Sequence, residues 1–240
     1  MLGFMGEIKY IGKCLLVNEE GKRILVVGDL HLGWEESLNM SGVFVSREMF
    51  KEVIEYFDLV FKKIGMVDEV VLLGDVKHVF GKIIPQEWKD VLGLFDYLEK
   101  KCGKIVIVKG NHDVILEPIV KKSNVELRDF YSVGDFCFAH GDKNFLEMEN
   151  FRNWILGHGH PAVKIGDGIK VEKYKCFLAG KFRGKKVIIV PSFFEGNLGS
   201  DPRENNLEMA WNFALGKFDV KIVQDESLEV LDFGSLRKLK

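Results

Sequence analysis

The chain has 240 residues, 47% of them apolar and 29% charged, which suffices for one large buried core, so we expect a single domain over residues 1–240. No segment approaches the ~18 consecutive apolar residues of a membrane helix, and the start lacks the plan of a secretion signal, so we expect a cytoplasmic protein without a membrane partner. A net charge of −2 gives no overall cationic field for binding nucleic acid. The four cysteines are scattered without a CxxC pair, which indicates reduced core residues and not a disulfide frame or a zinc site.

Short apolar runs that each end in a polar, glycine-containing turn recur along the chain. They are ILVVGDLH (24–31), VVLLGDVKH (70–78), IVIVKGNHD (105–113), FCFAHGD (136–142) and WILGHGHP (154–161). Because runs of this length bounded by glycine are typical of buried strands, each predicts a strand followed by a polar turn.

Amphipathic helices are expected between the first of these strands. Apolar residues at helical spacing predict a helix from Ser46 to Ile64, with Ser46 as its N-cap. A second helix should begin after Pro85 and end near Cys102, with Gly103 as its terminator. This strand–helix–strand–helix–strand order favours an α/β layer with parallel strand pairs.

The chain after Val125 is predicted to be mostly β-structure. Strands are expected at 125–127, 136–139, 154–157, 186–190 and 229–233. This run of strands indicates a second sheet packed on the first. The segment FFEGNLGSDPRENN (193–206) either walls the site or closes the fold, and we favour the second interpretation.

Polar side chains follow the predicted strands at their carboxyl ends, where the loops of open α/β sheets converge and ligands bind. The turns therefore bring together Asp29, His31, Asp75, Asn111, His112, His140, His158 and His160. All six histidines of the chain lie in or beside these turns, the sixth being His78. Histidines used only for packing would be scattered, so we interpret this group as a functional site.

The mixture of ligand types indicates a transition-metal site. Imidazoles with carboxylates and without thiolates suit Mn, Fe, Zn, Ni or Co better than calcium. On an extended segment, His158 and His160 would point the same way and serve neighbouring metals. Asp29 and His31 have the same spacing and would grip one ion together. Two close metals need a bridging ligand, for which the carboxylate of Asp75 is the candidate.

The ordered motifs GDLH, GDVKH, GNHD, HGD and GHGH resemble the five blocks of the calcineurin-like metallophosphoesterases. The resemblance implies an α/β (α+β) fold, a β-sandwich of two mixed sheets flanked by helices. It also implies a hydrolase of phosphoester bonds with a dinuclear centre. In such an enzyme a metal-bridging hydroxide attacks phosphorus in line, since two cations lower the pKa of bound water towards ~7.

Carried over position by position, the resemblance also implies the site residues. One metal would be held by Asp29, His31 and His160, the other by Asn111, His140 and His158, and Asp75 would bridge the two. His112 would contact the phosphoryl oxygens and protonate the leaving group. Many members of the family carry an acidic residue three positions after the bridging aspartate, to orient this histidine, but here that position is His78. We expect His78 to accept a hydrogen bond from His112, or Asp113 to take its place.

A narrower resemblance rests on GDLHLGWE, GDVKH and GHGHP. These motifs are similar to the phosphoesterases associated with DNA ligases and helicases in prokaryotic DNA repair, and to their archaeal relatives. The resemblance implies a Mn-dependent phosphodiesterase or nuclease in the cytoplasm, with a repair helicase or ligase as partner. Trp34 follows the first motif and would either stack on a base at the mouth of the site or be a half-buried aromatic.

Two alternatives to the phosphodiesterase remain open. The first is a small-molecule phosphomonoesterase or cyclic-nucleotide phosphodiesterase, because the nearly neutral charge does not favour a long polyanion. The second is a catalytically weak adaptor of a DNA-repair complex, against which the complete ligand set argues. Either enzyme should retain about two ions, whereas an adaptor need not. The sequence leaves the oligomeric state open.

Overall fold

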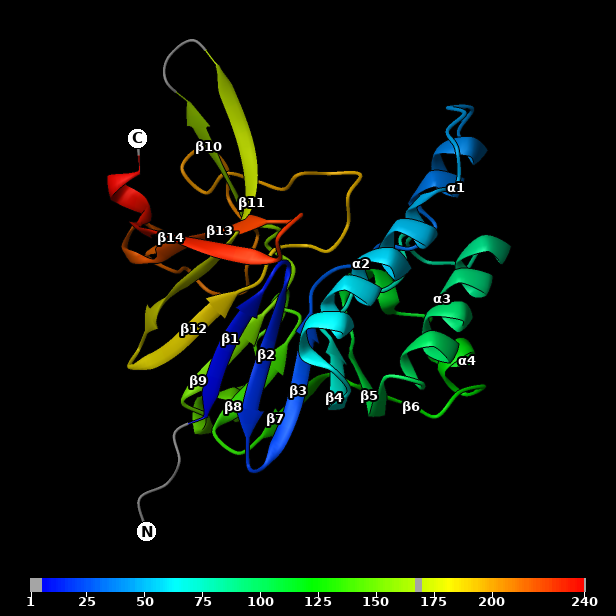
Figure 1. The fold of residues 1–240 in the computed structure, drawn as a ribbon, viewed down its shortest axis with the longest axis horizontal. Helices are drawn as coiled ribbons and strands as arrows, with labels where there is room; N and C mark the ends of the chain where they lie inside the picture. The colour runs from blue at the N-terminus through cyan, green and yellow to red at the C-terminus, as the bar shows by residue number, and fades with distance from the viewer. Residues whose placement is uncertain (1–5, 167–169, 240) are drawn as a thin grey trace.

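The computed structural model describes residues 6–166 and 170–239, which form two facing β-sheets with helices beside one of them (Figure 1). The strands of the first sheet, in spatial order, are β1 (Glu7–Ile11), β2 (Cys14–Glu19), β3 (Lys22–Val27), β4 (Val67–Leu72), β5 (Cys102–Val108) and β6 (Val125–Arg128). Strands β3 to β6 pair in parallel, and β1 to β3 are antiparallel. The parallel strands therefore end at one edge of the sheet.

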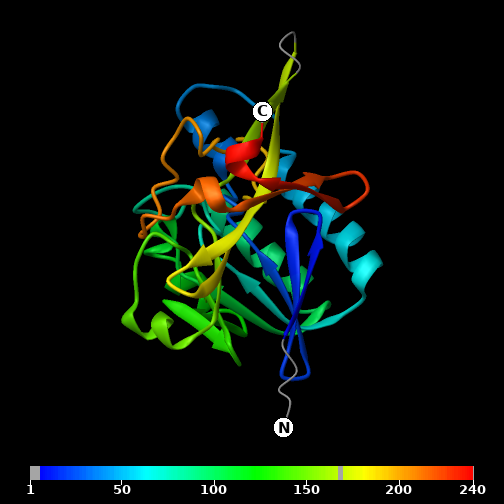
Figure 2. The same ribbon diagram turned by 90° about the vertical axis from the view of Figure 1, so that its left-hand side faces the viewer.

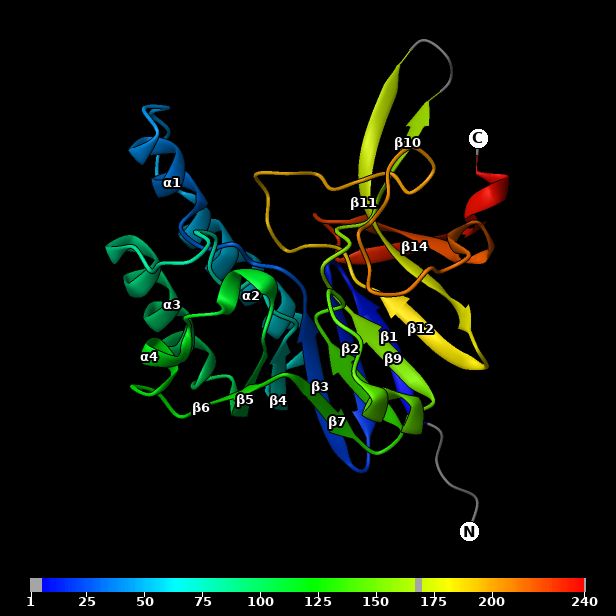
Figure 3. The ribbon, with the colours of Figure 1, turned by 180° about the vertical axis from the view of Figure 1, so that it is seen from behind.

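The second sheet is also mixed. Its strands, in spatial order, are β14 (Glu229–Ser235), β13 (Asp219–Gln224), β11 (Val171–Phe182), β12 (Lys185–Ile189), β9 (Asn153–Leu156), β8 (Phe136–Ala139) and β7 (Phe130–Val133). Strand β10 (Ala162–Gly166) pairs with β11, and this hairpin projects from the body of the molecule (Figure 2). Only Asp129 separates β6 from β7, so the chain passes directly from one sheet to the other (Figure 3).

The helices are few and mostly short. They are α1 (Trp34–Met40), α2 (Met49–Ile64), α3 (Pro85–Leu98), α4 (Glu117–Val120) and the 3₁₀ turns η1 (Asn111–Asp113), η2 (Leu146–Asn150), η3 (Leu215–Lys217) and η4 (Leu236–Lys238). None of the helices in the described ranges combines the length and the apolar character that crossing a membrane requires.

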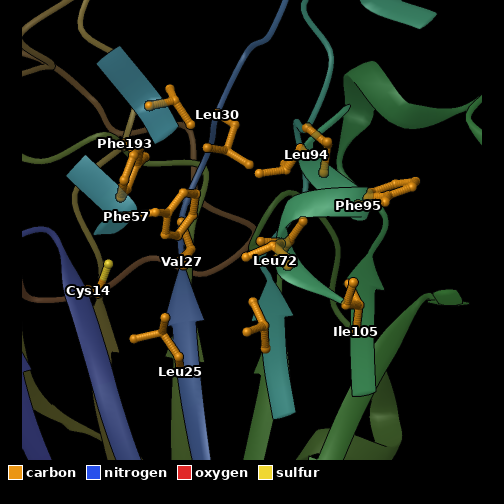
Figure 4. Packing of buried hydrophobic residues seen from close by; sticks show 14 of the residues in the cluster. Cys14, Leu25, Val27, Leu30, Phe57, Leu72, Leu94, Phe95, Ile105 and Phe193 are labelled. Atoms are coloured by element: carbon orange, nitrogen blue, oxygen red, sulfur yellow. The ribbon is translucent and has the colours of Figure 1, made fainter. Parts of the chain in front are cut away.

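One hydrophobic core lies between the first sheet and the helices (Figure 4). Leu25, Val27 and Leu72 project from the parallel strands towards Phe57 of α2 and Leu94 of α3. All five side chains are at most 1% exposed. Removing the Phe57 ring from such a core would cost about 3–5 kcal/mol of stability.

Two further cores hold the second sheet in place. The first, which lies between the sheets, includes Val26, Val71, Phe138, Ile155 and Phe177. The second packs the irregular segment between β12 and β13 against the other face of the second sheet, through residues that include Trp154, Trp211 and Phe213. The two-sheet α/β architecture and the parallel pairing are as the sequence predicts. The prediction of one domain stays a prediction, with which the core shared between the sheets is consistent.

The predicted helix boundaries were wrong in two places. Helix α2 begins at Met49, and the side chain of Ser46 does not cap it. Instead, Oε1 of Glu35 in α1 accepts the N–H groups of Glu48 and Met49, at 2.9 and 3.0 Å. Helix α3 ends at Leu98, because residues from Cys102 onward pair with β4 as strand β5.

Candidate metal centre

The polar turns converge where strands of both sheets end. Backbone hydrogen bonds tie the first two turns together, since the N–H of His31 donates to the carbonyl of Asp75 at 2.8 Å. The N–H of Phe194, after β12, donates to the carbonyl of Asp29 at 3.1 Å. The local sequence makes this approach possible at Gly74, which has φ +86° and where a Cβ atom would lie 2.6 Å from the Gly110 nitrogen. The predicted site residues are therefore held by backbone that is itself fixed.

Asp29, His31 and His160 form the first group of ligand atoms, which lie within 4.8 Å of one another. Nε2 of His160 lies 3.2 Å from Oδ1 of Asp29 and 3.4 Å from Nε2 of His31. Both carboxylate oxygens of Asp29 also accept the backbone N–H of His158, at 3.1 Å. This second contact fixes the turn that carries His160.

Asp75, His140 and His158 form the second group, also within 4.8 Å. Nε2 of His140 lies 3.0 Å from Nδ1 of His158 and 3.2 Å from Oδ1 of Asn111. Oδ2 of Asp75 lies 3.5 Å from Nε2 of His140 and 3.7 Å from Nε2 of His31. Asp75 thus faces both groups, which is the placement that a bridging carboxylate needs.

Four of these residues adopt left-handed backbone conformations. Their φ angles are +49° at His31, +48° at Asp75, +63° at His158 and +40° at His160. Such angles are uncommon outside glycine and cost free energy, so they persist where the surrounding structure imposes them and cluster at functional sites. The expectation of an extended segment through His158 and His160 was therefore wrong, although the two side chains do enter different groups.

The buried charge of two carboxylates makes this site suitable for cations. Asp29 and Asp75 are 0% and 3% exposed, and their ion pairs among the described residues are all with histidines. Burial would raise the pKa of Asp29, but the neighbouring His160 and His140 hold it below its ordinary value. Burial, together with the charge of Asp29, raises the pKa of Asp75. Nδ1 of His31 is buried without a hydrogen-bond partner. Because buried carboxylates need compensating positive charge, divalent cations fit this donor set.

His112 lies at the rim of the same site. Its backbone N–H donates to Oδ1 of Asp75 at 2.9 Å, and its Nε2 lies 3.9 Å from Oδ2 of that residue. Its Nδ1 contacts the carbonyl oxygen of His78, so the expected contact with His78 forms through the backbone and not through the ring. The two rings instead stack, with centroids 5.6 Å apart. Burial, then the charges of His112 and Lys77, lower the pKa of His78 to about 4, so its imidazole is neutral near pH 7.

The side chain of Asp113 binds backbone N–H groups and does not contact His112, so the expectation that it orients His112 was wrong. Its fully buried carboxylate accepts backbone N–H groups of Val76 at 3.1 Å, Lys77 at 3.4 Å and Gly110 at 3.1 Å. Burial and the charge of Asp75 raise its pKa to about 6. Asp113 therefore joins the Asp75 turn to the Asn111 turn, and acts on the site through the backbone.

The segment after β12 does wall the site, so the interpretation of 193–206 as only a closing segment was wrong. The ring of Phe194 lies 5.3 Å from that of His31 and 6.3 Å from that of His78. Trp34 packs against Phe194 at 5.2 Å and is half-buried in the first core. The sequence gives no periodic signal for this contact, because an irregular loop makes it.

Lys175 on β11 supports this wall and was not singled out from the sequence. Its buried ammonium lies within hydrogen-bonding distance of four oxygens, namely the carbonyl and hydroxyl oxygens of Ser192, both at 3.0 Å, the carbonyl of Asn197 at 3.2 Å, and that of Phe194. A lysine inside a strand otherwise rich in apolar residues was the available signal. Four oxygens around one ammonium fix the loop that carries Phe194.

This α/β fold, with buried histidines and aspartates gathered at its strand ends, defines a metal-dependent hydrolase. The family model of the calcineurin-like phosphoesterases matches residues 22–223, so the chain belongs to that family and hydrolyses phosphoester bonds. Nuclease MPE from Pseudomonas putida has a similar structure, with a TM-score of 0.64, 16% sequence identity, and coverage of 95% of this chain and 100% of that one. Yfce, a phosphoesterase from E. coli, gives a TM-score of 0.43 at 14% identity, covering 87% and 96% of the two chains. None of the curated proteins matches this chain in sequence.

Proposed function

We propose that this protein is a Mn-dependent phosphodiesterase with a dinuclear centre, acting on nucleic acid or a related diester. The observation that carries the proposal is the pair of ligand groups that share Asp75 as a common neighbour. The nuclease with the similar fold supports the choice of a diester substrate. At 16% sequence identity, it supports no finer statement about the substrate. The cytoplasmic setting and a repair helicase or ligase as partner belong to the proposal on the strength of the sequence motifs alone.

The proposed ligands follow the two groups. One ion would be held by Asp29, His31 and His160, the other by Asn111, His140 and His158, with Asp75 between them. Two bound divalent ions would supply a water of lowered pKa, ~7, and positive charge for the phosphoryl oxygens. His31 offers its Nε2 to this group, and its Nδ1 is the nitrogen left without a partner.

His112 is proposed to bind the phosphoryl group and to deliver a proton to the leaving oxygen. Because its Nδ1 donates to the His78 carbonyl, Nε2 is the nitrogen available to the substrate. An acid in this position contributes about 10²–10⁴-fold to the rate of an ester cleavage. His78, neutral and stacked on the His112 ring, orients that ring by contact and through its carbonyl.

A second candidate is a phosphatase for a small phosphomonoester or a cyclic nucleotide, which the net charge of −2 favours over a long polyanion. The adaptor alternative is disfavoured, because four of the proposed ligand residues hold a strained backbone that an inert site would not need.

The test compares Mn-dependent hydrolysis of bis(p-nitrophenyl) phosphate and p-nitrophenyl phosphate by the intact chain. Preference for the diester supports the proposal, and preference for the monoester supports the phosphatase. Asp75→Asn should abolish activity on both, whereas Asp58→Asn, a matched change at a side chain 59% exposed on α2, should leave it intact. Full activity of Asp75→Asn with saturating Mn would show that the bridging assignment is wrong. No activity on either compound, with two ions bound, would leave a very selective enzyme or the adaptor.

A further inference from the structure

An exposed aromatic side chain stands beside the proposed reaction centre. The ring of Phe80 is 64% exposed, and its centroid lies 5.6 Å from that of His112, with the two planes at 85°. Exposing a large apolar ring costs free energy that burial would recover. A ring left in water next to a substrate-facing histidine is therefore placed to contact the substrate.

The turn that carries Phe80 is anchored at both ends by buried charged groups. The carboxylate of Glu87, 0% exposed, accepts the N–H of Ile84 at 3.0 Å and also the N–H of Val79. The ammonium of Lys77, also 0% exposed, donates to the carbonyl of Val79. Because Val79 is held from two sides, the adjoining Phe80 stands on a fixed backbone, so little backbone freedom is lost when a ligand packs on its ring.

For Trp34 the sequence left open a base-stacking position at the mouth of the site or a half-buried one, and the structure shows the half-buried position. The Trp34 ring packs 5.2 Å from that of Phe194 and is half-buried against the first core. Phe80 is therefore the aromatic residue beside His112 whose surface is mostly open.

We propose that Phe80 forms a stacking subsite for a nucleobase next to the phosphoryl group that His112 contacts. The inference rests on the proposed phosphodiesterase function and names its substrate class as nucleotide diesters. Every nucleobase offers a flat π-face, and its stacking on an aromatic side chain is worth about 5- to 150-fold in affinity, whichever base is present. The subsite selects for a base without reading its identity.

The test uses four chromogenic diesters with the same p-nitrophenyl leaving group. Thymidine is attached through its 5′ or its 3′ oxygen, and each compound has an abasic counterpart that carries deoxyribose alone. KM and kcat are measured with Mn for the wild type, Phe80→Ala and Phe80→Tyr. Phe44→Ala, at an 88% exposed ring between α1 and α2, serves as the matched control.

In one of the two linkages, the wild type should show a KM about 5- to 150-fold lower for the thymidine compound than for its abasic counterpart. Phe80→Ala should lose this preference with little change in kcat, while Phe80→Tyr and Phe44→Ala keep it. An equal preference in the wild type and in Phe80→Ala, or no preference in the wild type, overturns the subsite. If none of the four diesters is hydrolysed while p-nitrophenyl phosphate is, the proposed function fails first and the subsite with it.

Discussion

Lys175→Met removes a buried ammonium while keeping the length of the side chain. Burial lowers the pKa of Lys175 from its ordinary 10.5 to about 8, with smaller opposing contributions from acidic neighbours such as Glu195. Between these two values the unfolded chain holds a proton that the folded chain has released. The stability of the wild type therefore rises with pH in this window, relative to the variant. The difference between the two values corresponds to about 3 kcal/mol, at about 1.4 kcal/mol per pKa unit.

Urea unfolding of both proteins at pH 7, 8, 9, 10 and 11 measures this difference, because the other titrating groups cancel between them. We expect the stability of the wild type minus that of Lys175→Met to rise by about 3 kcal/mol across the series. Lys82→Met, at an exposed position, controls for the loss of a surface charge and should show no such slope. If the stability of the wild type minus that of Lys175→Met did not change with pH, the reasoning would be refuted. That result would mean that the four oxygens around the ammonium fully replace its hydration.

Three further predictions concern the centre itself. Gly74→Ala should lower the free energy of unfolding by about 1–3 kcal/mol, measured by thermal unfolding. The reason is that φ is +86° at this position and the new Cβ would collide with the Gly110 nitrogen and with His140. Unchanged stability would contradict that packing. Asp113→Asn should cost about 1–3 kcal/mol, because it turns an amide N–H₂ towards backbone donors, and should also weaken Mn binding by calorimetry. Removing metal with EDTA should lower the melting temperature, and ~100 Kd of Mn should restore about 2.7 kcal/mol per independent site.

Much of the first sheet was predictable from the sequence, because the parallel strands β3, β4 and β5 end in apolar runs that lead into glycine-containing turns. The turns at Asp29, Asp75 and Asn111 follow β3, β4 and β5, and topology alone brings them to one edge. Strands β1, β2, β7, β10, β11 and β13 were not predicted. They pair antiparallel with their neighbours, and those partners are set by tertiary contacts.

The site was predictable by residue type but not by geometry. Spacing indicated that His158 and His160 serve different groups, yet their left-handed backbone results from contacts such as the bond from the His158 N–H to Asp29. The N-cap was assigned to Ser46 by local pattern, whereas Glu35 of the neighbouring helix supplies the acceptor. Phe194 reaches His31 from a loop that is distant in sequence. Each of these wrong predictions involves a contacting residue that lies outside the local stretch of sequence from which the prediction was made.

The central claim is a two-ion centre in which Asp75 is shared. Its most direct test is the metal content of the intact chain after loading with Mn and gel filtration, measured by inductively coupled plasma mass spectrometry. The wild type should retain two ions per chain, and Asp75→Asn should retain fewer. His78→Ala, which leaves every proposed ligand in place, should still retain two. One ion or none in the wild type, or two ions in Asp75→Asn, would contradict the account.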